Sequence, residues 1–255
     1  MKKTTLALAA VLGLGSLQAY AADAPKPDWA FTGNAGLFSD YRFRGISQTN
    51  KKPAFQGGFD VSHVSGFYAG NWNSNIDSAF FNGANLEMDF YGGYKLPLGD
   101  LTLDFGALHY YYPGSGAGGS FKIDNTELYV GGSYGPVSLK YFHAVSDFFG
   151  AVDSKNSQYL DAGFAYDLGG GLGVNAHVGY QKLKGGARVV EIGSASLEDT
   201  IIDWKLGATY DILGSGFVAG AAYVSTNRDL TGGTAALSGR NISNGTLVLS
   251  LSKTF

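Results

Sequence analysis

Two arginines stand on alternate positions of a charged stretch, SDYRFRG, at residues 39–45. Because side chains at alternate positions of a β-strand share a face, Arg42 and Arg44 would point the same way as Asp40. Guanidinium groups bind anions through paired hydrogen bonds, so the two arginines could attract anionic solutes. The alternative is structural: the arginines pair with Asp40 or with an acid of the next strand.

Further ionisable residues alternate with apolar ones along the rest of the chain. With Asp40, Arg42 and Arg44, eight acids stand against five bases on the polar faces of these segments. The other members are Asp60, Glu87, Asp89, Lys95, Asp104, Glu127, Lys140, Asp161, Asp203 and Lys205. If these faces line a channel, the excess of acids favours cations. Since the signs interleave, most of these groups are also expected to pair and brace the wall.

Five aromatic side chains share these polar faces: Tyr91, Tyr110, Tyr129, Phe142 and Tyr159. An aromatic track inside a pore could bind sugars or other amphipathic solutes. The alternative is that the rings fill the interior of a narrow barrel.

Alternation of period two predicts the strands that carry these residues. In the C-terminal segment TLVLSLSKTF (246–255), Leu247, Leu249 and Leu251 fall on one face and serine and threonine on the other. Ten residues match the 9–11 that a tilted strand needs to cross a bilayer. Twelve such segments are expected, at 31–45, 54–63, 66–74, 85–96, 101–112, 125–134, 137–145, 158–168, 172–181, 202–211, 217–225 and 246–255. In the ambiguous segment 66–74, Tyr68 and Trp72 are expected on the apolar side.

The connections alternate in length. Five short turns near 64–66, 97–100, 135–136, 169–171 and 212–216 separate six longer loops. Outer-membrane barrels have short turns on one side and long loops on the other, and lipid tolerates no open sheet edge. The sequence therefore predicts an all-β fold: a transmembrane, antiparallel up-and-down β-barrel of about twelve strands. The alternative is a soluble, secreted β-sandwich.

The first residues predict export from the cytoplasm. Lys2 and Lys3 precede an apolar stretch, Leu6 to Leu14, and a small-residue site at Ala19-Tyr20-Ala21. This is the pattern of a secretory signal peptide, expected at 1–21, which leaves a single barrel domain at 22–255. The chain has no cysteine, so it has no disulfide framework. Loss of Lys2 and Lys3 lowers Lys+Arg from 18 to 16 against 21 Asp+Glu, which argues against nucleic acid as a partner.

Three segments resemble a known family: YRFRGISQT (41–49), PAFQGGFDV (53–61) and GFYAGNWNSN (66–75). Together with EMDFYGGY (87–94) and the aromatic C-terminal strand, they are similar to the TorF family of proteobacterial porins, formerly conserved hypothetical proteins. The resemblance implies an outer-membrane β-barrel that forms a pore. It brings no settled substrate and no catalytic residues. The terminal Phe255 resembles the signal by which the outer-membrane assembly machinery recognises barrels.

Enzyme chemistry finds little support in the sequence. The four histidines are His63, His109, His143 and His177; the first three are expected on the lipid face and His177 inside. Neither a Gly-x-Ser-x-Gly motif nor a metal-ligand spacing accompanies them, and no cofactor is expected. The predicted function is a passive channel for small hydrophilic solutes or ions, with outer-membrane lipid, the assembly machinery and the solutes as partners. The alternatives are a structural or adhesion barrel with a plugged lumen and, less well supported, an outer-membrane hydrolase. Loops 113–121 and 182–201 are the expected gates.

Overall fold

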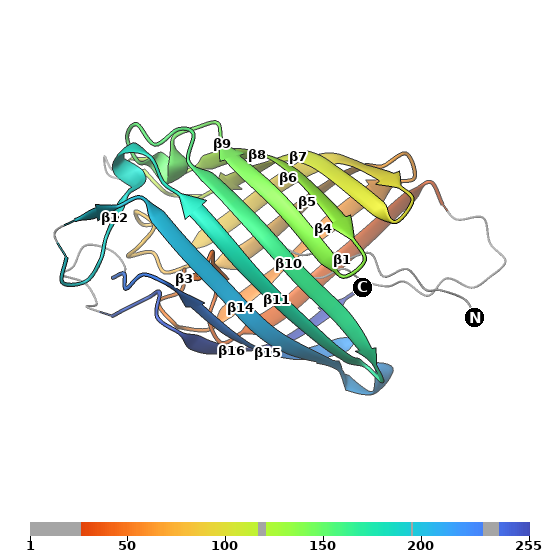
Figure 1. Ribbon diagram of the computed structural model, residues 1–255. Helices are drawn as coiled ribbons and strands as arrows, with labels where there is room; N and C mark the ends of the chain where they lie inside the picture. The colour runs from red at the N-terminus through yellow and green to blue at the C-terminus, as the bar shows by residue number, and fades with distance from the viewer. Residues whose placement is uncertain (1–26, 117–120, 195, 232–239) are drawn as a thin grey trace.

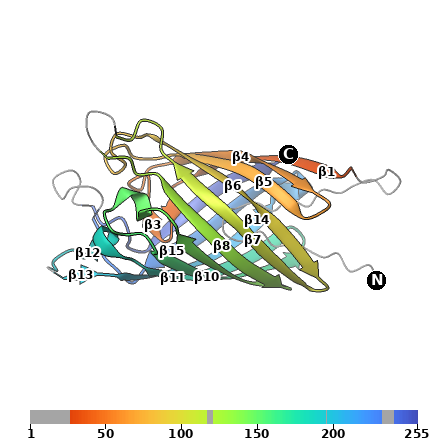
Figure 2. The same ribbon diagram turned by 90° about the horizontal axis from the view of Figure 1, so that it is seen from above.

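The computed structural model describes residues 27–116, 121–194, 196–231 and 240–255. In these ranges twelve antiparallel strands close into one barrel, because β1 pairs with both β4 and β16 (Figure 1; Figure 2). The strands, in chain order, are β1 (Trp29–Phe38), β4 (Ala54–His63), β5 (Phe67–Asn75), β6 (Leu86–Leu98), β7 (Leu101–Tyr111), β8 (Asn125–Tyr134), β9 (Val137–Ala144), β10 (Gln158–Gly169), β11 (Leu172–Lys182), β14 (Thr200–Asp211), β15 (Phe217–Thr226) and β16 (Thr246–Thr254). The predicted fold is confirmed. The predicted signal peptide at 1–21 lies outside the described residues.

Short connections gather at one end of the barrel and long ones at the other. The turns at 64–66, 99–100, 135–136, 170–171 and 212–216 lie at the end where β1 begins. The longer loops carry the smaller elements: the hairpins β2 (Arg42–Phe43) with β3 (Ile46–Ser47) and β12 (Val189–Val190) with β13 (Leu197–Glu198), and the 3₁₀ turns η2 (Phe148–Gly150) and η3 (Gly185–Ala187). A further turn, η4 (Ile212–Gly214), lies at the short-turn end. Within the described ranges, no helix has the length and apolar character to cross a membrane.

Alternating side chains separate an apolar outer face from a polar interior. Phe31 is 72% exposed and Leu249 54% exposed, whereas Glu87, Glu127 and Asp203 are at most 1% exposed. The expected leucine-out, serine-in arrangement of the last strand is confirmed, since Ser250 and Ser252 pair with Gly220 and Val218 on the inner face. The face expected for β5 is wrong: Trp72 is buried inside the barrel and the Tyr68 hydroxyl reaches the Asp104 carboxylate.

The first predicted strand is too long. It was expected to run to residue 45, but β1 ends at Phe38, and the chain then turns into the barrel as the β2–β3 hairpin. The two residues between Phe43 and Ile46 are Arg44 at φ 45° and Gly45 at φ 79°, which is the type I′ geometry that hairpins favour. Arg42 and Arg44 are therefore not on a barrel strand.

Because the chain turns inward after Phe38, Tyr41 and Phe43 lie inside the barrel and not on the expected lipid face. Tyr41 packs edge-on against Trp72 of β5, and Phe43 against Tyr110 of β7.

Asp40 holds the base of the hairpin together. Its Oδ1 accepts a hydrogen bond from the Ser47 hydroxyl at 2.6 Å and lies 3.1 Å from the Thr49 hydroxyl oxygen, and its Oδ2 accepts from Arg42 Nε at 2.5 Å. Arg42 in turn donates to the Ile242 carbonyl and the Thr246 hydroxyl, next to the start of β16. One carboxylate thus links both arms of the hairpin to the arginine that ties them to the barrel.

Substituting Asp40→Ala should release the hairpin without opening the barrel. Hydrogen bonds to a charged group contribute about 1.5–3 kcal/mol each, and the barrel strands do not depend on them. Trypsin should then cleave the folded variant after Arg42 and Arg44 at least ten times faster than the native protein, as read by mass spectrometry of the fragments. Asp199→Ala, which removes an exposed partner of Lys182, serves as the control and should change nothing. Equal cleavage rates in native protein and variant would contradict the role of Asp40.

Candidate solute pathway

The tip of the β2–β3 hairpin crosses the lumen. The hairpin leaves the wall between β1 and β4, and in the ring of strands β8 to β11 lie on the far side. Arg44 Nη2 lies 2.6 Å from Glu127 Oε2 of β8, and Nη1 donates to Gln181 Oε1 of β11 at 2.6 Å. The hairpin therefore spans the interior at the long-loop end.

Aromatic rings surround the Arg44 guanidinium. Its Cζ lies 4.1 Å from the ring centre of Tyr159 (β10), 5.5 Å from that of Phe142 (β9) and 5.7 Å from that of Phe148 in η2. The Arg44 side chain is only 8% exposed. Gly45 fits tightly on the other side, because a Cβ there would lie 2.7 Å from Asp203 Cβ of β14. The tip is thus enclosed on several sides.

The lumen beside the tip is acidic. Glu87 accepts hydrogen bonds from Tyr41 and, at 2.6 Å, from Tyr112. The neighbouring Asp89 is fully buried, and neither of its oxygens has a hydrogen-bond partner among the described residues. The two carboxylates lie on β6 within a few residues of the long-loop end, so a positive charge entering from that end would meet them early.

A second acidic pair is joined by a histidine. His177 Nδ1 lies 2.5 Å from Asp161 Oδ1, and its Nε2 lies 2.6 Å from Asp203 Oδ1. The Tyr159 hydroxyl donates to Asp203 at 3.0 Å, and Lys205 is close enough to interact electrostatically with both acids. His177 was expected inside, but its two partners were not foreseen. His177 pairs with Gly163 on β10 and with Lys205 on β14, and each acid stands two residues before one of these positions on the same face. The strand register could therefore have indicated both partners.

Nearer the short-turn end, the remaining predicted residues pair with one another. Lys140 Nζ lies 2.7 Å from Asp104 Oδ2, and Tyr68 donates to the other oxygen of that carboxylate at 2.6 Å. Tyr91 donates to Asp60 at 2.5 Å. The expected pairing of acids and bases is confirmed for Asp40–Arg42 and Asp104–Lys140. Arg44 also pairs with an acid, but the expected partner is wrong: it is Glu127 on the far side of the barrel and not Asp40 or an acid of the next strand. Within the described residues no group of acids and histidines is arranged to hold a metal ion.

The two halves of the lumen differ in the size of their side chains. The aromatic track predicted from the sequence lies on one half and faces inward: Tyr91, Tyr110, Tyr129, Phe142 and Tyr159. Apart from Lys205 and Phe38, which are large, the inner face of the other half, from β14 round to β1, carries mostly small residues: Gly207, Thr209, Gly220, Ala222, Ser250, Ser252 and Gly36. Small side chains fill less of a barrel interior. The room for a solute is therefore expected along β14, β15, β16 and β1.

The prediction for one gating loop, 113–121, stays untested, and the described part of the other, 182–201, lies elsewhere. Residues 117–120 of the first loop and residue 195 of the second lie outside the described residues. The described part of the second forms η3 and the β12–β13 hairpin, which Figure 1 shows beyond the end of the barrel. Among the described residues, the loop segment that crosses the lumen is 39–53, whose chain reverses at the Arg44-Gly45 turn.

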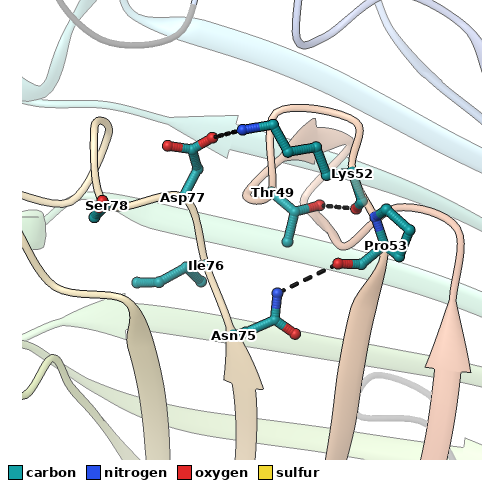
Figure 3. A pocket seen from close by; sticks show the side chains of 7 residues that line it. All are labelled: Thr49, Lys52, Pro53, Asn75, Ile76, Asp77 and Ser78. Atoms are coloured by element: carbon teal, nitrogen blue, oxygen red, sulfur yellow. Dashed lines mark hydrogen bonds and ion pairs between the residues drawn. The ribbon is translucent and has the colours of Figure 1, made fainter.

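A surface pocket of 270 Å³ marks where the hairpin returns to the wall (Figure 3). Lys52 Nζ lies 2.9 Å from Asp77 Oδ2, and the Asp77 N–H donates to the Gln48 carbonyl at 2.9 Å. The Thr49 hydroxyl donates to the Lys52 carbonyl at 2.6 Å. The hydrogen bond from Lys52 holds the pKa of Asp77 below its ordinary value. The pocket is thus the second attachment of the hairpin, to the loop after β5.

Residues 21–255 match the family model described as "Bacterial protein of unknown function (Gcw_chp)". No curated protein matches the chain. Among solved structures, the NanC porin is 12% identical, with a TM-score of 0.55 over 89% of this chain and 99% of that one. The KdgM porin in complex with oligogalacturonate is 8% identical, with a TM-score of 0.49 over 88% and 97%. OprD of Pseudomonas aeruginosa is 16% identical, with a TM-score of 0.42 over 88% and 65%. The likeness to NanC supports the same barrel fold.

Removing Lys52 should raise the pKa of Asp77. Because this pKa is lowered in the folded protein, the contact stabilises the fold at neutral pH, and its contribution is lost as the pH falls through the pKa of Asp77. In Lys52→Gln, the midpoint of the Asp77 carboxyl titration, measured by NMR in micelles, should move up toward the ordinary value. Lys51→Gln, which changes the neighbouring lysine, should leave it in place. Since Lys52 is 64% exposed, the loss of stability at pH 7 should stay below about 1 kcal/mol. An unchanged midpoint in Lys52→Gln would contradict this assignment.

Proposed function

The chain belongs to the Gcw_chp family of bacterial proteins of unknown function, and we propose that it is an outer-membrane channel for passive diffusion of small hydrophilic solutes or ions. The observation that carries the proposal is the closed ring of strands with an apolar outer face and a polar inner one. Such a ring satisfies every backbone group internally, and its lumen offers solutes a route round the hydrocarbon.

Two similarities support the proposal. The NanC structure, whose fold this chain shares, is that of a porin. The segments at 41–49, 53–61 and 66–75 resemble the TorF porins. Passage through such a channel requires no chemical reaction and no cofactor. Outer-membrane lipid would cover the outer face, and the assembly machinery would recognise the last strand and Phe255.

The hairpin would make the channel narrow. It spans the long-loop end, so solutes would pass beside it along the small-residue wall or after it moves. Of the predicted selectivity residues, Arg42 is bound to Asp40, Ile242 and Thr246, and Arg44 to Glu127 and Gln181. The acids around them would then set the preference, in favour of cations. A permanently plugged structural barrel is the second candidate, and the same hairpin is its support.

Conductance in a planar lipid bilayer tests the proposal. The refolded protein without residues 1–21 should give small, discrete current steps, with a reversal potential in a salt gradient that indicates cation preference. Replacing residues 40–51 by a short Gly-Ser linker should raise the step size several-fold, because the lumen loses its largest obstruction. Steps only in the shortened variant would favour the plugged barrel, and silence from both folded proteins would refute the channel.

Neighbouring residues of β16 test the membrane-facing surface. Leu249→Lys places a charge on the outer face, which costs about 2–4 kcal/mol near the middle of a bilayer. Ser250→Lys places the same charge in the lumen, where water and acids can accept it. Unfolding by urea in lipid vesicles should therefore show a large loss of stability for Leu249→Lys and a small one for Ser250→Lys. Equal losses would argue that the outer face does not meet lipid.

A further inference from the structure

The wall opposite the hairpin forms a binding site of its own around the Arg44 guanidinium. Its carboxylate is Glu127 of β8, its amide oxygen is that of Gln181 of β11, and its closest ring is Tyr159 of β10. Phe142 of β9 lies between them in the ring of strands. Four consecutive wall strands thus supply a carboxylate, a carbonyl oxygen and two aromatic faces to one point in the lumen.

These side chains are held by the wall and not by the hairpin. The Tyr110 hydroxyl donates to Glu127 Oε2 at 3.1 Å, and Gln181 Nε2 donates to the Gln158 carbonyl at 2.8 Å. Tyr159 is fixed by its hydrogen bond to Asp203. The orientation of Gln181 leaves its oxygen pointing at the guanidinium. The site would therefore keep its shape if Arg44 left, which is the preorganisation that binding sites require.

The site has capacity that Arg44 does not use. Glu127 Oε1 is fully buried and has no hydrogen-bond partner among the described residues. Arg44 contacts only Oε2, although a guanidinium can engage both oxygens of a carboxylate at once. The guanidinium of a free solute, which is not attached to the hairpin backbone, could bind both oxygens of Glu127 at once.

The backbone indicates that Arg44 is held at some cost. An arginine at φ 45° adopts the left-handed conformation, which is unfavourable for residues with a side chain and is more often found in asparagine or glycine. Strained conformations of this kind persist where surrounding contacts stabilise them, and they mark functional positions.

We infer that this wall site binds the guanidinium group of cationic solutes, such as alkylguanidiniums, and that Arg44 occupies it as a tethered competitor. The inference rests on the proposed channel for its role in transport, but not for the binding itself. A carboxylate, a carbonyl oxygen and a ring face at 4.1 Å match the charge, the planar donors and the π-affinity of a guanidinium better than those of an ammonium. A solute that displaces Arg44 would take over the contacts that hold the hairpin tip across the lumen.

Rescue of an Arg44→Gly variant tests the binding without any current measurement. Glycine suits the positive φ at this position, so the hairpin keeps its turn while the guanidinium is removed. Methylguanidinium at low millimolar concentration should raise the thermal unfolding temperature of this variant in a saturable way. Urea, a neutral molecule of similar shape, should not raise it. The native protein, whose site is filled, should respond at least about tenfold more weakly.

Two further variants make the result specific. Adding Glu127→Gln to Arg44→Gly should abolish the rescue, because the carboxylate is lost. Arg228→Gly removes an arginine that pairs with Glu191 and Glu198 in the outer loops, and it should show no rescue. If Arg44→Gly does not refold, Arg44→Gln is used, which also lacks the charge.

Rescue by urea as well, rescue that survives Glu127→Gln, or no rescue in a folded Arg44 variant would each overturn the inference. Bilayer recordings separate it from the proposed function. Current steps in Arg44→Gly that methylguanidinium does not block would leave the channel standing and remove the solute site from its path. Rescue in a protein that never conducts would leave the binding site standing and remove the channel.

Discussion

The whole structure depends on the closure of the sheet between β1 and β16. A strand with an unpaired edge exposes backbone groups that hydrocarbon cannot satisfy, and each would cost several kcal/mol. The pairing of Leu37 with Leu251 and of Asn34 with Thr254 removes the last open edge. Closure also requires each strand to present one face inward over its full length. The alternation of apolar and polar residues becomes an outer and an inner surface for this reason.

Closure also places the polar faces of the strands, with their carboxylates, inside the barrel. Inward-facing carboxylates are withdrawn from bulk water, and burying a charge is costly unless it is paired or hydrogen-bonded. The barrel uses tyrosine hydroxyls for this purpose, at Asp60, Asp104 and Glu87, and bases at Asp104 and Glu127. Asp89 is an exception, since neither of its oxygens has a partner among the described residues. The aromatic side chains therefore have two functions, because the same rings that fill one half of the lumen carry the hydroxyls that stabilise its acids. The small residues of the other half do not have these two functions.

The hairpin connects these features to function. It brings a base to acids that would otherwise repel one another, and in doing so it narrows the lumen at one end. Its charged attachments are Asp40 and Arg42 at the base, Lys52 and Asp77 at the return, and Arg44 at the tip, and the rings of Tyr41 and Phe43 add contacts with the wall. Because β2 and β3 pair only with each other and not with a barrel strand, this segment is easier to displace than a strand of the closed sheet.

Much of this architecture could be predicted from the sequence alone, because period-two alternation and loop length are local properties. They determined the number of strands, their approximate ends, and the inward position of Glu87, Glu127, Asp161, Asp203 and His177. They also indicated that acids and bases would pair. They did not determine the path of residues 39–53, since alternation continues through Tyr41 and Phe43 and does not show where the chain reverses. A predicted strand of 31–45, longer than a bilayer requires, was the available signal. Only the tertiary structure decided that Arg44 meets Glu127 and Gln181, because those partners lie on the far side of the ring. Their proximity depends on the diameter of the closed barrel, which no single segment encodes.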